Sequence, residues 1–145
     1  MAAVKFQRDA MLDAALNFIK TKATYVSITT ASLGSQDLTS TAAYTKAFND
    51  PSTSSGYCLA KVAISASDFT GPANGDASGR KLTLNQQSSL SVLGSGANSA
   101  AMVAILGVST SVNYVLYTTT CTVQSLTAGN TVTIPAWKME IADAT

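Results

Sequence analysis

The chain has 145 residues, the length of a single domain with a sizeable core; it is 46% hydrophobic and only 12% charged, with a net charge of +1. The nine basic residues are scattered, which argues against a nucleic-acid partner, because such proteins cluster Lys and Arg to displace counterions. Histidine is absent, which excludes Ser/His and Cys/His catalysis and His-based metal sites, so we expect no enzyme activity, no cofactor and no metal.

An amphipathic helix is predicted for residues 7–22. Apolar side chains recur there at helical spacing, and acidic residues near its start and basic residues near its end complement the helix dipole. The apolar stripe consists of Leu12, Leu16 and Ile19, widened by Met11, Ala15 and Phe18. Because this stripe is wide for a lone surface helix, we expect it to pack on a sheet or on a neighbouring subunit.

β-Branched and aromatic residues with a period of two follow the helix. They predict strands over residues 25–31 and 57–64. Residues 32–56 between them are rich in turn formers and are interpreted as an excursion, with a short helix over 41–48 inside it.

The second half of the chain alternates strands with turns. A connection over residues 67–79 leads to strands at 80–84 and 88–92, and a tight turn is expected at 94–96. Residues 100–107 are apolar on both faces, which is typical of a central strand covered on both sides.

A clearer strand follows at residues 112–120. The whole pattern indicates a mainly β protein, a β-sandwich of jelly-roll or immunoglobulin-like type with an N-terminal helix. We expect one domain over 1–145, with a helical arm (1–24) and a β-sandwich (25–145).

The last strand contains a change of parity. Val132 and Ile134 would face one side of a regular strand, whereas Trp137, Met139 and Ile141 would face the other. Proline cannot donate to a ladder, so a bulge near residues 135–136 is predicted to restore a single inward face. All five apolar side chains should then be largely buried.

Cys58 and Cys121 are far apart in sequence and belong to no CxxC pair. We interpret them as two half-buried thiols, with a disulfide as the alternative. The longest apolar run, residues 100–108, is too short to span a bilayer, and charges interrupt the apolar residues near the N-terminus, so we expect neither a membrane segment nor a secretory signal.

Three further groups of residues are candidates for chemistry. Asp9 and Asp13 lie four apart on the helix, where a solvated polar face explains them better than an acid/base dyad. The loop at residues 74–79 offers oxygen ligands but lacks EF-hand spacing, so turn chemistry is favoured over a calcium site. Arg80 and Lys81 could contact an acidic patch on a partner, or could discourage stray pairing at a strand edge.

The chain resembles small virion structural proteins of tailed bacteriophages. The resemblance covers most of the sequence apart from residues 32–56, and it lies in residues 12–20 (LDAALNFIK), 67–70 (SDFT), 75–76, 78–83 (SGRKLT), 86–87, 126–137 (LTAGNTVTIPAW) and 140–141. It implies a head decoration (cement) protein or a small tail or neck component, with a β-sandwich fold and no catalytic residues.

The expected function is therefore that of a capsid decoration protein located in the virion. Its partners would be the major capsid protein or other virion proteins and further copies of itself, because low surface charge permits self-association. A trimer is favoured because capsid junctions commonly have three-fold character. A tail, neck or tail-tube component is the first alternative, and a host carbohydrate-binding module is the second. The expected interface residues are Leu12, Leu16, Ile19, Arg80 and Lys81.

Overall fold

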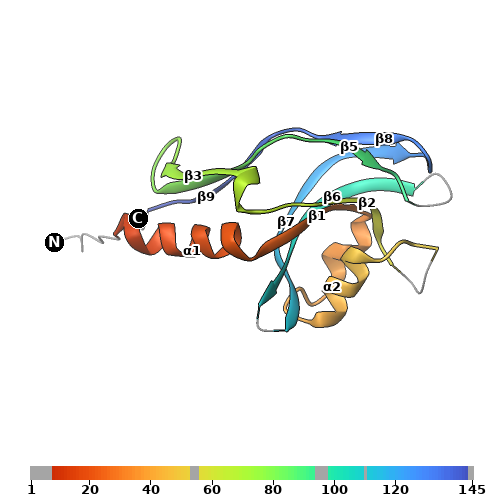
Figure 1. The fold of residues 1–145 in the computed structure, drawn as a ribbon, viewed down its shortest axis with the longest axis horizontal. Helices are drawn as coiled ribbons and strands as arrows, with labels where there is room; N and C mark the ends of the chain where they lie inside the picture. Colours follow the sequence, from red (N-terminus) through yellow and green to blue (C-terminus); the bar gives the residue numbers. More distant parts are fainter. Residues whose placement is uncertain (1–7, 53–55, 94–97, 110, 144–145) are drawn as a thin grey trace.

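The computed structural model describes residues 8–52, 56–93, 98–109 and 111–143 (Figure 1). It is mainly β, with an N-terminal helix and antiparallel sheets, as the sequence predicts. The helices and strands are α1 (Asp9–Lys22), β1 (Ala23–Thr29), α2 (Thr41–Phe48), β2 (Cys58–Ala63), β3 (Phe69–Asn74), β4 (Arg80–Leu84), β5 (Gln87–Ser91), β6 (Asn98–Ser109), β7 (Val112–Leu126), β8 (Thr131–Ile134) and β9 (Trp137–Ile141). Two short 3₁₀ helices, Ala31–Ser35 and Ala66–Asp68, complete the described elements. The turn expected at 94–96 and the helix start expected at residue 7 lie outside the described residues.

The largest sheet has four antiparallel strands in the order β2-β1-β6-β7. Its interior strand β6 is buried on both faces: Val103 and Ile105 belong to the main core, whereas Ala104 and Leu106 belong to a second apolar cluster. The prediction of a central strand covered on both sides is therefore confirmed.

Helix α2 forms the cover on one face of this sheet (Figure 1). It begins where Ser40 accepts a hydrogen bond from the backbone N–H of Ala43 at 3.2 Å, the usual role of an N-cap serine. Tyr44 and Ala47 of the helix pack with Leu33 against β6. The short helix predicted within the excursion is confirmed, and the described part of this excursion packs on the sheet.

The other face of the four-stranded sheet packs against a long ribbon made by β4 and β5 with β9 and β8. Leu84 pairs with Trp137 and Gln87 pairs with Ile134, so the ladder breaks for two residues on each strand and then resumes in the same register. The break at Pro135 divides the ribbon into a three-stranded sheet (β3-β4-β9) and a two-stranded sheet (β5-β8).

This break confirms the irregularity predicted near residues 135–136, although it takes a different form. Two residues are unpaired on both strands, so the chain changes parity without the extra residue of a one-sided bulge. The bulge-like register shift lies instead on β5, where Ser89 adopts a φ of 59°. Ile134 and Met139 are fully buried, and Val132, Trp137 and Ile141 are half-buried and pack against the main core.

Strand β3 was not expected, because its residues fall within the predicted connection 67–79. It contains Gly71, with φ of 106°, and Pro72, and its register with β4 shifts between Thr70 and Ala73. An edge strand tolerates these residues, since one of its sides needs no ladder hydrogen bonds. Turn-forming residues therefore concealed the strand in the sequence.

Helix α1 packs on this chain rather than projecting as an arm. Leu12 and Leu16 are buried, and Leu16 and Ile19 contact the main core. Arg80 on β4 holds the helix from the side, donating to Asp13 at 2.7 and 3.2 Å. The inner stripe of the helix, Leu12, Leu16 and Ile19, thus packs against the sheets of the same chain. Met11 and Phe18, which widen that stripe, are 64% and 48% exposed.

The four-stranded sheet and the ribbon that packs on it are linked along one side and are not linked along the other. A bridge between Ala60 on β2 and Val92, just after β5, links the four-stranded sheet to the β5–β8 pair, and Leu93 N–H donates to Leu59 C=O at 2.7 Å beside it. On the opposite side β7 and β8 are adjacent in sequence, yet within the described residues they are not paired with each other.

Candidate functional site

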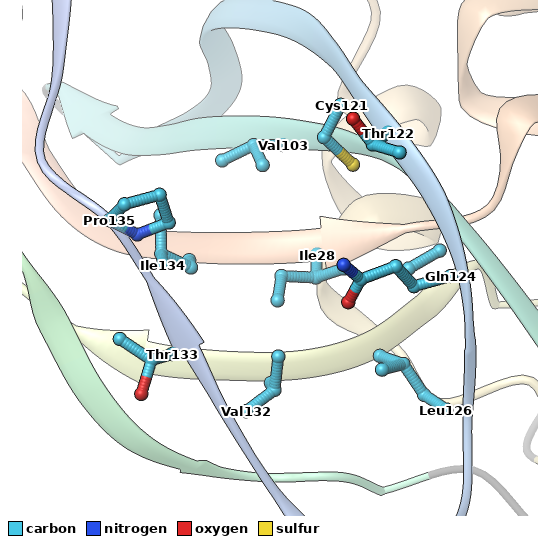
Figure 2. A pocket seen from close by; sticks show the side chains of 11 residues that line it. Ile28, Val103, Cys121, Thr122, Gln124, Leu126, Val132, Thr133, Ile134 and Pro135 are labelled. Carbon is cyan, nitrogen blue, oxygen red and sulfur yellow. The ribbon is translucent and has the colours of Figure 1, made fainter.

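A slot lies on the open side of the fold, between the C-terminal half of β7 and strand β8 (Figure 2). Side chains from β1 and β6, Ile28 and Val103, form its floor, and Cys121 points into it from β7. The sides of the slot are completed by Ala100, Thr122, Gln124, Leu126, Val132, Thr133, Ile134 and Pro135. The slot thus leaves side chains of the main core facing a cavity of about 200 Å³.

A second cavity of about 250 Å³ adjoins the first and shares four of its lining residues. It extends toward β9, where Trp137 and Lys138 border it. An apolar cavity of about 150 Å³ holds a benzene molecule, so each space matches one medium or large apolar side chain. The two cavities together suit an elongated apolar ligand better than a compact polar one.

Strand β7 is an edge strand that lacks two of the usual protections against pairing, charged residues and proline, although its register with β6 shifts at two places. Its fifteen residues carry no charge and no proline, and Val112 and Val123 are 52% and 64% exposed. Natural edges are usually blunted by charges, proline, bulges or a covering segment. An edge of this length and composition is suited to being covered by another chain.

Three of the other described edges carry such protection. β3 contains Pro72, and β9 carries Lys138 and Glu140 on a short strand. The outer side of β2 is partly occupied by the bridge from Ala60 to Val92. Among the described residues, β7 is therefore the long edge that is left open.

The two cysteines have different environments and are both free thiols. Cys58 is fully buried on β2, and burial raises the pKa of its thiol to about 12. Cys121 is half-buried at the slot, and its pKa is also raised by desolvation. Since only the thiolate reacts readily with electrophiles, Cys58 should be inert and Cys121 the reactive thiol.

The loop that offered calcium ligands is held by ion pairs. The Asp76 carboxylate contacts the ammonium groups of Lys81 and Lys138, and Glu140 accepts from the backbone N–H of Asp76. The loop therefore uses its carboxylate to tie the ends of β4 and β9 together. Within the ranges that the structure describes, no group of three or more His, Cys, Asp or Glu residues could hold a metal ion.

The five expected interface residues do not form one surface. Leu12 and Leu16 are buried by this chain itself and have no surface left for a partner, which corrects the expectation for these two. Ile19 packs against the main core, Arg80 pairs with Asp13, and Lys81 pairs with Asp76. These side chains hold the helix, the sheet and the loop together.

Trp137 borders the second cavity from the start of β9. Its ring lies 5.5 Å from that of Tyr117, centroid to centroid, and it packs against the main core as the sequence predicts. The indole N–H is buried without a hydrogen-bond acceptor among the described atoms.

Sequence reasoning did not identify the slot. The uncharged run of residues 112–126 was the available signal, but the sequence cannot show that β7 lies at an edge. None of the described helices has the length and apolarity needed to cross a membrane. Comparison with protein-family models, with curated protein sequences and with solved structures finds no match to this chain.

Proposed function

We propose that this chain is a structural protein of a tailed-bacteriophage virion, a decoration protein that binds the outside of the capsid and stabilises it. The observation that carries the proposal is β7, a fifteen-residue, uncharged edge strand whose outer side is left open within the described residues. Such an edge invites aggregation in a free protein and becomes an advantage in an assembly, where a partner covers it.

The composition supports the same function. About a quarter of the residues are Ser or Thr and only 12% are charged, so neighbouring copies or subunits repel one another weakly. Helix α1 adds the exposed apolar side chains Met11 and Phe18 to the surface. A capsid presents the same site many times, so modest contacts at each site add up to a large stabilisation of the shell.

Two further parts of the proposal concern the fold and the assembly state. We class the architecture as a β-sandwich, because the four-stranded sheet and the β4–β5/β8–β9 ribbon enclose the main core between them. A trimer is the favoured assembly, since three-fold junctions between capsid subunits would hold three copies of the chain.

The test is the number and position of copies of this chain in purified particles. We expect a copy number that scales with that of the major capsid protein, and density on the outer capsid surface in cryo-electron microscopy. A few copies confined to the tail or neck would favour the tail component instead. Absence from purified particles would contradict both structural functions.

A further inference from the structure

We propose that the slot between β7 and β8 receives an extended, uncharged segment of the major capsid protein, which binds as an added β-strand. This inference rests on the proposed function and specifies how the capsid is bound. The segment would place one apolar side chain into each of the two adjoining cavities and would cover the exposed part of the main core.

The occupant is a polypeptide because backbone edges border the slot. Within the described residues β7 pairs with β6 alone and β8 pairs with β5 alone, so each strand has a side whose N–H and C=O groups lack a ladder partner. An extended chain supplies donors and acceptors at the strand repeat, which is the basis of peptide recognition by strand addition. A small apolar molecule would fill the cavities and leave these backbone groups unpaired.

The side chains of the occupant are specified by the lining. The floor consists of Ile28 and Val103, and the first cavity is lined entirely by uncharged residues. Lys138 is the single charged side chain among the residues that line the second cavity. A charge on the inserted segment would lose its hydration without gaining a partner, so the segment must be uncharged where it faces the floor.

A described strand of a second copy does not fit this slot. Every strand that the structure describes is already paired on at least one side, so a strand of a second copy could pair with β7 or with β8 but not with both. The slot therefore needs a segment that is unpaired before binding. A flexible loop or arm of a capsid subunit meets this requirement.

Cys121 provides the test, with Cys58 as an internal control. N-ethylmaleimide should label the isolated protein at Cys121 and leave Cys58 unmodified. In intact particles we expect the labelling of Cys121 to be slower by more than about tenfold, because the inserted segment covers the thiol. Mass spectrometry of the recovered protein identifies the labelled residue in each case.

The reverse experiment measures binding. Protein already labelled at Cys121 should fail to bind particles that lack this chain, whereas treatment with the same reagent should not change the binding of a Cys121→Ser variant relative to the same variant left untreated. Binding of the labelled protein with unchanged affinity, or equally fast labelling in particles and in solution, would overturn the slot proposal alone.

Two other outcomes identify different errors. If Cys121 is protected in the isolated protein and becomes reactive on dilution, the occupant is a second copy and the capsid segment is wrong. If the unlabelled protein does not bind depleted particles at all, the proposed function fails and the slot proposal fails with it.

Discussion

Replacing Leu16 with alanine is expected to lower the free energy of unfolding by about 2–5 kcal/mol. Leu16 is only 1% exposed and belongs to the main core, where it joins α1 to the sheets. Alanine removes the apolar contacts and leaves a cavity that the surrounding strands fill only in part. Urea unfolding of the purified protein, followed by circular dichroism, measures the loss.

Met11→Ala is the matched control on the same helix. Met11 is 64% exposed, so its replacement should change the free energy of unfolding by less than about 0.5 kcal/mol. If both substitutions changed the free energy of unfolding by the same small amount, the inner stripe of α1 would not be covered by this chain. Leu16 would then again be a candidate interface residue.

Replacing Thr122 with aspartate is expected to weaken binding to depleted particles by about tenfold or more, because it places an unpaired carboxylate at the slot. Thr122 is exposed at the rim of the first cavity, so the isolated protein should keep its thermal stability. Aspartate is preferred to lysine here, since a long side chain can carry its charge back to water. Co-sedimentation with particles over a range of protein concentrations gives the affinity.

Val112→Asp is the control for charge on the same strand. Val112 is 52% exposed at the start of β7 and lines neither cavity, so this variant should weaken binding far less than Thr122→Asp does. If both aspartates weaken binding equally, β7 is recognised along its whole length and the slot has no special part. If neither has an effect, the capsid binds another face.

Local patterns in the sequence predict most of the elements. The helical period of Leu12, Leu16 and Ile19 predicts α1, and the ranges 41–48 and 80–84 coincide with α2 and β4. The parity change around Pro135 also predicts a real break in pairing. Each of these features is determined by residues that are close together in the chain. There the spacing of apolar side chains and the backbone preferences of the residues favour the same structure.

The remaining features depend on contacts between distant segments. Strand β3 was concealed because Gly71 and Pro72 are turn formers that an edge strand tolerates. Strand β7 continues to Leu126, six residues beyond its predicted end at 120, because the polar residues of its second half are exposed and give no alternation. The slot arises from the order of strands around the core, which no local period encodes.

The central claim is that binding of this chain stabilises the capsid, and particles assembled without it test that claim most directly. A protein that binds only the intact shell stabilises each site by RT ln(1 + [L]/Kd), so adding purified protein should raise the temperature at which the particles release their genome, in a saturable manner. The measurement is DNA release, followed with a fluorescent dye during heating. We predict early release from depleted particles and full recovery after addition of the protein. Release at the same temperature with and without the protein would contradict the account.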